Sequence, residues 1–438
     1  MGIRLSRYLT KTALFFSAHR KALRYLYVVA VVLILFGVVV YPVYLNLANP
    51  QMDVFVGRTE FNRQFAERIR PYVREMGRMG DFAVFAHNIW ENYPFFAMAE
   101  RTVGVDVDTV GMEAFEYLQE VAQFAGDRLF LDFLDNNFIQ EFGGLGGLRL
   151  STEGSAMPRW FLQPYFFGYY DWRFFDERAV VYTRDYNFTT QTLAGGIAYM
   201  RVNSFLPKGY EAVSRRPFWH FDFGTERARV LEFYQSLYGY DDLVIDIRGL
   251  ANGFSEYFIP MIVEPNLSAS VSARFYGFHM DGEFAHTVSE AFRNWHGMAE
   301  LRPVTAFPQI IESGNADDFE LLEYGFAIDL EARPMGNAPA FDGQIWLLTD
   351  SGTFTGVNHM YLKLALQAGF NIIYEENPYA SGWDLSFSRL PNSRIAVRYN
   401  PLYFTDDVGR AFEEFGAEPT HRLAEINNLG EVVAIIQG

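Results

Sequence analysis

The sequence predicts a mixed α/β protein in which a mainly parallel sheet follows a small helical unit and one transmembrane helix. From residue 195 onward, short runs rich in β-branched residues alternate with longer amphipathic runs, and a strand, helix, strand order favours parallel pairing. Half of the 438 residues are hydrophobic. The chain can therefore bury a large core, and its composition excludes global disorder.

The amino-terminal segment is predicted to be a membrane anchor. Residues 25–45 carry no charge, and their number matches the roughly 20 residues that a helix needs to cross a bilayer. Six of the 36 basic residues and none of the 53 acidic residues lie in the first 45 positions. The positive-inside bias therefore predicts a single-pass protein of the cell membrane, with residues 1–24 in the cytosol and residues 46–438 outside. A cleaved signal peptide is the alternative, although the apolar run is longer than such peptides use and no small-residue cleavage site follows it.

The charge balance and the missing cysteines exclude several classes of function. A formal net charge of -17 gives a negative field that repels phosphate backbones. We therefore expect no nucleic-acid partner. Without cysteine the chain has no disulfide, no thiol nucleophile and no thiolate metal site. No histidine pair with an acid at ligand spacing and no nucleotide-binding glycine motif occurs either, so we expect neither a metal nor a cofactor.

Composition divides the segment after the anchor into four parts. Residues 46–80 are mixed polar and charged, with two prolines, and are expected to form a stalk. Residues 81–150 have apolar residues at helical spacing and end in a glycine-rich turn, which predicts a helical unit. Residues 151–194 form an aromatic connecting segment, whose rings are expected to pack in a core. A glycan or cell-wall binding platform is the alternative for that segment. Residues 195–438 then form the α/β domain.

Periodicity predicts the strands and helices of the α/β domain. Short runs with β-branched and aromatic residues indicate strands, and longer amphipathic runs between them indicate helices. The predicted strands are 195–205, 242–248, 344–350, 370–376 and 394–400, and the predicted helices are 225–239, 287–301 and 357–369.

A hydroxyl residue follows one predicted strand, at a position that suits a catalytic nucleophile. The predicted strand 344–350 ends at Asp350, a glycine-containing turn follows, and Thr355 stands at the mouth of the helix 357–369. The unpaired N–H groups and the positive dipole end of a helix suit a nucleophile beside an oxyanion pocket. The same position equally suits an ordinary helix N-cap.

Four segments of the α/β domain resemble the tail-specific, or C-terminal processing, serine peptidases and the core domain of tricorn protease. The stretch ENYPFFAMAE at 91–100 is also similar to the amino-terminal unit of that family. The resemblance implies a crotonase-like ββα spiral core in residues 195–438. The four segments are GIAYMRVNSF at 196–205, LVIDIRG at 243–249, LLTDSGTFTGVNHMYLKLALQAGFNIIYEE at 347–376, and LPNSRIAVRYN with FEEFGAEPT at 390–400 and 412–420.

The resemblance places the family's nucleophile at Thr355, where a hydroxyl is kept, and the family's orienting acid at Glu413. The general base is missing, because the Lys of one branch falls on Ser381 and the His of the other branch falls on Gly147. The only local substitute is His359, four residues after Thr355 on the same helical face. Helical geometry sets those two side chains side by side, so His359 is expected to be a surface or packing residue rather than a base.

The resemblance also implies an oxyanion site made by backbone N–H groups at Gly249, Leu250 and Gly356. The family has a glycine-rich turn at this position, and the matching residues 249–253 of this chain read Gly-Leu-Ala-Asn-Gly. Only the two ends of the turn are therefore still glycine. Peptidases of this family hold extended peptides by adding them as a strand, a mode that depends on backbone hydrogen bonds. We expect such a groove near Phe354 and Leu250.

These substitutions favour a membrane-anchored pseudo-protease that binds a peptide or unfolded protein segment outside the cytosol, with hydrolysis lost or severely impaired. A threonine hydroxyl stays protonated near neutral pH and needs a base within hydrogen-bond reach. The alternative is an active serine-type endopeptidase that uses Thr355 as nucleophile in the proteolysis of extracytoplasmic proteins. Fold likeness alone does not decide between the two.

Overall fold

The structure is a computed structural model of the chain. It describes residues 67–72, 77–121, 126–151, 166–167, 188–203, 224–250, 257–295, 297, 299–350, 356–375, 387–390, 392–393, 395–416 and 418–438. The predicted anchor at 25–45 lies outside these ranges. Within them, no helix is both long and apolar enough to cross a membrane. Residues 67–72 of the predicted stalk are helical, and Ile69 is fully buried.

The predicted helical unit consists of short helices around an aromatic core. The ring of Phe82 lies 6.2 Å from that of Phe115 and 6.0 Å from that of Phe138, measured between centroids. Gly104 ends one helix in the left-handed conformation, a common helix stop. The elements are η3 (Arg70–Tyr72), α4 (Arg78–Asn92), α5 (Phe96–Val103), α6 (Val107–Val121), α7 (Asp127–Leu134), η4 (Asp135–Ile139) and η5 (Leu145–Gly147).

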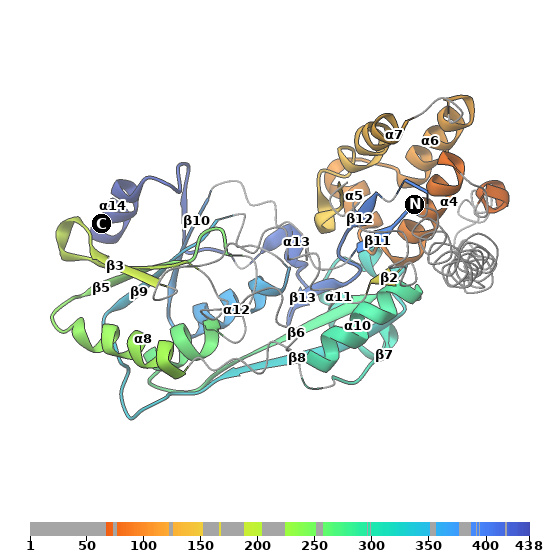
Figure 1. Ribbon diagram of the computed structural model, residues 1–438. Coiled ribbons are helices and arrows are strands. Elements are labelled where there is room, and N and C mark those ends of the chain that lie inside the picture. The colour runs from red at the N-terminus through yellow and green to blue at the C-terminus, as the bar shows by residue number, and fades with distance from the viewer. Residues whose placement is uncertain are drawn as a thin grey trace, which may run out of the picture. The chain divides into compact units, whose positions relative to one another are not determined.

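A six-stranded sheet in the order β14-β10-β9-β5-β4-β3 forms the centre of the α/β domain (Figure 1). Every neighbouring pair is parallel except β3 and β4, which confirms the predicted mainly parallel pairing. Its strands are β3 (Phe188–Thr192), β4 (Ala198–Val202), β5 (Asp242–Asp246), β9 (Gln344–Leu348), β10 (Asn371–Glu375) and β14 (His421–Leu423). The associated helices are α8 (Gly224–Ser236), α12 (Gly356–Gln367) and α14 (Leu429–Gln437).

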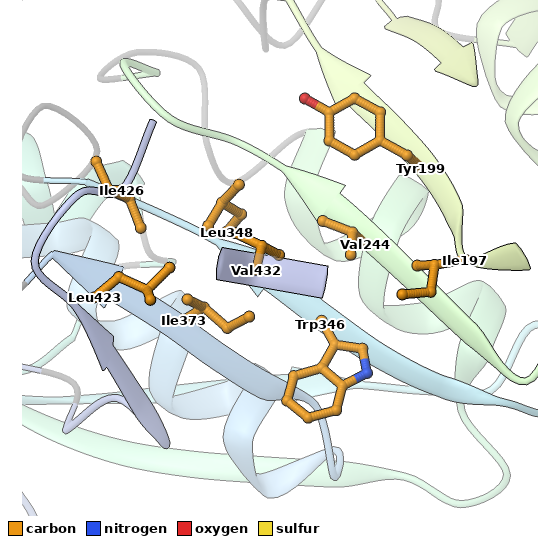
Figure 2. Packing of buried hydrophobic residues seen from close by; sticks show 9 residues of the cluster. All are labelled: Ile197, Tyr199, Val244, Trp346, Leu348, Ile373, Leu423, Ile426 and Val432. Carbon is orange, nitrogen blue, oxygen red and sulfur yellow. The ribbon is translucent and has the colours of Figure 1, made fainter. Parts of the chain in front are cut away.

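One face of this sheet is covered by the carboxyl-terminal helix α14. Figure 2 shows Val432 of α14 over apolar side chains of the neighbouring strands. Because successive residues of a strand point to opposite faces, Val244 faces α14 and its neighbour Ile245 faces the other side. Both are fully buried, so the sheet has a core on each face. The α14-side cluster is Ile197, Tyr199, Val244, Trp346, Leu348, Ile373, Leu423, Ile426 and Val432.

Two antiparallel sheets complete the fold. One has the order β13-β6-β8-β7, with β6 and β8 paired over nine residues from Val271↔Ala332 to His279↔Tyr324. Helix α12 packs against β6, β8 and β10. The elements are β6 (Val271–His279), β7 (Arg302–Pro303), β8 (Tyr324–Ala332), β13 (Tyr403–Asp406), η9 (Phe258–Val263), η10 (Glu264–Asn266), α10 (Glu283–Trp295), η11 (Val304–Ala306), α11 (Pro308–Ser313), η12 (Ala316–Phe319) and α13 (Phe412–Phe415).

The second antiparallel sheet corrects the prediction for residues 394–400. That segment does form a strand, β12 (Ala396–Arg398), but it belongs to a small sheet in the order β1-β12-β11-β2 rather than to the parallel sheet. Its partner β1 (Arg149–Ser151) comes directly after the helical unit. The remaining strands are β2 (Phe166–Phe167) and β11 (Phe387–Arg389). Most of the aromatic segment 151–194 lies outside the described residues, so its glycan-binding alternative stays an expectation.

Candidate functional site

A glycine-rich turn marks one side of the candidate site. Gly143, Gly144, Gly146 and Gly147 all have positive φ, from 57° to 78°. A Cβ added at Gly146 would lie 2.4 Å from ring atoms of Phe95. The hydroxyl of Tyr93 donates to the carbonyl of Leu145 at 2.8 Å. The turn is therefore fixed by both its own backbone conformation and its contacts with the helical unit.

Asn400 connects this turn to Glu413. The backbone N–H of Asn400 donates to the carbonyl of Gly146 at 2.7 Å. Its side-chain amide donates to Oε1 of Glu413 at 3.3 Å, and its Oδ1 accepts from the N–H of Leu402 at 3.0 Å. Asn400 is fully buried. The structure thus brings the turn that contains Gly147 next to the predicted acid, although the two are far apart in sequence.

Glu413 is a buried carboxyl with an unusual proton affinity. It lies in the short helix α13 and is 6% exposed. Among the described residues, its Oε2 has no hydrogen-bond partner. Burial raises the pKa of Glu413 to about 7, although the hydrogen bond from Asn400 opposes the shift. A carboxyl of this kind holds a proton over part of the neutral range.

His359 packs against the same short helix. It is 1% exposed, and its ring centroid lies 5.5 Å from that of Phe412, the residue before Glu413. Burial, with a smaller effect of the positive charge of Lys363, lowers the pKa of His359 to about 3. Its imidazole is therefore a weak proton acceptor at neutral pH. Of the two expected positions for His359, this burial supports packing and excludes the surface.

The predicted oxyanion turn follows strand β5. Gly249 has a φ of 74°, and its N–H donates to Oδ1 of Asp350 at 2.8 Å. The N–H of Leu250 donates to the carbonyl of Ile247 at 3.3 Å. Gly356 is the first residue of α12. The backbone N–H groups of Gly249 and Leu250 therefore already have hydrogen-bond acceptors within the protein.

A buried network of charged side chains holds the residues that precede this turn. Asp246, which is fully buried, accepts from the hydroxyl of Tyr199 at 2.5 Å, from Arg201 at 2.6 Å and from Arg248 at 2.6 Å. Arg248 also donates to the carbonyl of Ile426 at 2.7 Å. Burial alone would raise the pKa of Asp246, but the hydrogen bonds from Arg248, Arg201 and Tyr199 lower it overall. The network fixes the residue immediately before Gly249.

A second network fixes the helix that carries Glu413. Arg101 of α5 donates to both carboxylate oxygens of Glu414, at 2.9 and 2.8 Å, and to Oδ2 of Asp318 at 2.7 Å. The hydroxyl of Tyr403 donates to the same Asp318 oxygen at 2.8 Å. The helical unit is therefore linked to α13 by charge-assisted hydrogen bonds.

Three predicted positions lie outside the described residues: Thr355, Ser381 and Phe354. The roles of Gly147, Glu413, Gly249, Leu250 and Gly356 stay predictions as well. The sequence did not single out Asn400, which contacts two parts of the site. Within the described ranges, no group of three or more His, Asp or Glu side chains is placed to hold a metal ion.

Comparisons with solved structures identify the fold. The structure of a putative peptidase from Parabacteroides merdae aligns with a TM-score of 0.50 and 14% identity, over 83% of this chain and 96% of that one. Mature CPAF aligns with a TM-score of 0.48 and 9% identity, over 82% of this chain and 96% of that one. The photosystem II D1 C-terminal processing protease aligns with a TM-score of 0.28 and 12% identity, over 56% of this chain and 50% of that one.

The first of these similarities shows that the chain shares the mixed α/β fold of the Parabacteroides protein. The other two similarities have TM-scores below 0.5. No protein-family model and no curated protein sequence matches the chain. A shared fold at this identity does not carry an activity with it.

Proposed function

We propose that the chain is a membrane-anchored, extracytoplasmic peptide-binding protein that keeps a peptidase-like fold and has lost, or severely impaired, hydrolysis. Its ligand is a peptide or an unfolded protein segment. The fold that the chain shares with a putative peptidase supports the part of the proposal that concerns the fold. The arrangement around Glu413 supports the proposed loss of hydrolysis.

The proposed loss of hydrolysis rests mainly on the hydrogen-bond partner of Glu413. In the peptidase family that the sequence resembles, this acid orients a histidine base. The position of that histidine corresponds here to Gly147, which has no side chain. In the structure, Oε1 of Glu413 accepts instead from the amide of Asn400 at 3.3 Å. An asparagine amide is not basic, so it cannot take a proton from a hydroxyl nucleophile.

The remaining groups of the site also support weak or absent hydrolysis. His359, with its pKa lowered to about 3, is a poor base at neutral pH. The amides of Gly249 and Leu250 already donate to Asp350 and to Ile247. An oxyanion at this turn would have to displace those acceptors, which reduces the stabilisation that preorganised donors give.

One observation favours the second candidate, an active endopeptidase with Thr355 as nucleophile. The pKa of Glu413 is raised to about 7, and its Oε2 has no hydrogen-bond partner among the described residues. A general base works best when its pKa lies near the working pH. On this candidate the carboxylate itself, rather than an imidazole, would accept the proton.

The deciding experiment measures binding and turnover of one unfolded substrate. The full chain in detergent micelles is incubated with fluorescein-labelled, unfolded casein, and binding is followed by fluorescence anisotropy and hydrolysis by the release of labelled fragments. Thr355→Ala removes the predicted nucleophile, and Thr190→Ala, on the exposed strand β3, is the matched control. We expect binding by all three proteins, and no hydrolysis that depends on Thr355.

Loss of a general base typically lowers the rate by about 10²–10⁴-fold. Hydrolysis that Thr355→Ala abolishes and Thr190→Ala leaves intact would establish the second candidate. In that case a rate that rises through pH 7, and that Glu413→Gln removes, would identify the carboxylate as the base. Absence of casein binding by the wild-type chain would contradict the proposed function.

The proposed anchor has its own test. A carboxyl-terminal epitope is fused to the full chain, and intact cells are treated with external protease. We expect the epitope to be cleaved and the chain to resist extraction by alkaline carbonate, because residues 25–45 are predicted to span the membrane with the amino terminus inside. An epitope protected until the membrane is opened would show the reverse orientation.

A further inference from the structure

The carboxyl ends of β5 and β9 lie side by side at the candidate site. Their parallel register ends with Asp246↔Leu348, and the next residue along β5, Ile247, donates its N–H to the carbonyl of Leu348 at 3.0 Å. In open α/β sheets, ligands bind outside the carboxyl ends of the parallel strands. The turn that carries Gly249 and the residues that follow β9 are therefore placed where this type of sheet receives a ligand.

One main-chain donor at this end of the sheet bonds to a side chain instead of to another main-chain group. The N–H of Gly249 donates to Oδ1 of Asp350 at 2.8 Å. Gly249 is exposed and Asp350 is half-buried, so this hydrogen bond lies near solvent, where a ligand can reach it. A carboxylate oxygen thus occupies the acceptor position of an accessible main-chain donor.

The backbone on both sides of this hydrogen bond is held in place. Arg248, directly before Gly249, donates to both carboxylate oxygens of the buried Asp246. Thr349, directly before Asp350, donates its N–H to a carbonyl of strand β10 at 3.0 Å. The N–H of Gly249 therefore keeps its direction, and the carboxylate of Asp350 leaves it by rotation of the side chain to another staggered rotamer.

We propose that Asp350 competes with the peptide ligand for the N–H of Gly249, and that a main-chain carbonyl oxygen of the peptide replaces the Asp350 carboxylate on binding. The inference rests on the proposed peptide-binding function and names the residue that limits the affinity of the site. A peptide held by main-chain hydrogen bonds needs donors of this kind. Only the fraction of molecules in which Asp350 has left Gly249 is ready to bind, and the apparent affinity is reduced by that fraction.

The experiment measures the dissociation constant of fluorescein-labelled, unfolded casein by anisotropy, with the full chain and its variants in detergent micelles. Asp350→Ala removes the competing acceptor. Hydrogen bonds to charged groups are among the stronger ones, so we expect casein to bind roughly tenfold more tightly. Asp350→Asn keeps a neutral acceptor, which forms a weaker bond, so we expect a gain of roughly threefold. Asparagine also keeps the shape of the side chain, and it tests the inference even if alanine disrupts the turn.

The matched control is Asp342→Ala. Asp342 is exposed and lies two residues before β9, at the opposite end of that strand from Asp350. Its removal changes the net charge of -17 by the same amount, so a general relief of repulsion between the chain and its ligand would appear in this variant too. We expect its affinity to match the wild type. The gain of the Asp350 variants should persist at high salt, which screens separated exposed charges. A melting temperature for each variant checks that it is folded.

The outcomes separate the inference from the function beneath it. If casein binds equally well to the wild type, to both Asp350 variants and to the control, Asp350 does not compete, and the peptide-binding function stands. Equal gains in Asp350→Ala and Asp342→Ala that disappear at high salt would assign the effect to net charge and overturn the inference. Weaker binding by folded Asp350 variants would show that the carboxylate contacts the ligand, which is the opposite of competition. If casein binds to none of the four proteins, the proposed function itself fails.

Discussion

The side-chain amide of Asn400 donates to the carboxyl of Glu413 at 3.3 Å. Through its own backbone N–H, Asn400 also bonds to Gly146 at 2.7 Å. One buried asparagine thus couples the glycine turn to the acid. Because Glu413 is buried and its pKa is raised to about 7, its protonation can be measured through the stability of the protein.

Glu413→Gln should change how stability depends on pH. Burial raises the folded-state pKa of Glu413 from 4.5 to about 7. The folded state therefore binds the proton more tightly than the unfolded state, and this contribution to stability is complete below pH 4.5 and lost as the pH rises through 7. The glutamine variant lacks this loss. Between pH 5 and pH 8.5 we expect the wild type to lose more free energy of unfolding than the variant, by on the order of 3 kcal/mol.

Urea denaturation at several pH values between 5 and 8.5 measures this difference. Glu120→Gln, on the exposed face of α6, is the matched control and should follow the wild type. Parallel curves for the wild type and Glu413→Gln would show that the buried carboxyl is already ionised at pH 5, which would contradict the raised pKa.

The parallel sheet was predictable from the sequence because its strands are buried on both faces. The run LVIDI at 243–247 is almost wholly apolar, and Leu243, Val244 and Ile245 are all fully buried. Such runs between amphipathic helices are typical of parallel α/β sheets. Strands β6 and β8 were missed, since their nine-residue antiparallel ladder mixes exposed and buried positions and includes Gly277.

Pairing partners were harder to predict than the strands themselves. Residues 396–398 were recognised as a strand, but their partner β1 lies near residue 150, and nothing local in the sequence indicates that register. The same reason hid Asn400. Its hydrogen bond to Gly146 uses the backbone N–H, which every residue except proline has. The type of residue at position 400 therefore does not indicate this contact.

Gly146→Ala should destabilise the fold more than Gly144→Ala. Both residues have positive φ, 57° and 78°, so alanine is strained at either position, by about 1 kcal/mol. At Gly146 the new Cβ would also lie 2.4 Å from Phe95, whereas at Gly144 nothing lies within 4 Å. Overpacking of this kind typically adds about 1–3 kcal/mol. Thermal and urea unfolding of both variants measure the difference, and equal losses would mean that the turn does not pack on Phe95.

Asp81→Ala should be strongly destabilising. Asp81 is fully buried and accepts from the backbone N–H groups of Asn392 at 2.7 Å and Ser393 at 2.6 Å. Removal of the carboxylate leaves these donors without their acceptor, and each unsatisfied buried group costs about 1–3 kcal/mol. We expect a loss of about 3 kcal/mol in the free energy of unfolding. Asp132→Ala, at an exposed position of α7, should cost far less. A loss below about 0.5 kcal/mol for Asp81→Ala would show that water replaces the carboxylate.

Arg101→Ala should loosen the helix that carries Glu413. Arg101 is 33% exposed and joins Glu414 to Asp318, whose side chain is 2% exposed. Removal of the guanidinium leaves a buried carboxylate without its cation, and after allowance for the exposure of Arg101 we expect a loss of about 2 kcal/mol. Arg101→Lys should recover less than half of it, because Arg101 donates to Glu414 through Nη1 and to Asp318 through Nη2, whereas lysine offers a single nitrogen.

The control for this pair is Arg68→Ala, since Arg68 and its partner Glu116 are 50% and 61% exposed and such pairs contribute little. Arg101→Ala should also shift the pH-dependent loss of stability caused by Glu413 to lower pH, because a looser α13 lets water reach the carboxyl and stabilise its charged form. Equal stability of Arg101→Ala and Arg68→Ala, with the Glu413 transition unmoved, would mean that α13 is held in place by its apolar contacts alone, such as that of Phe412 with Phe275 at 5.7 Å.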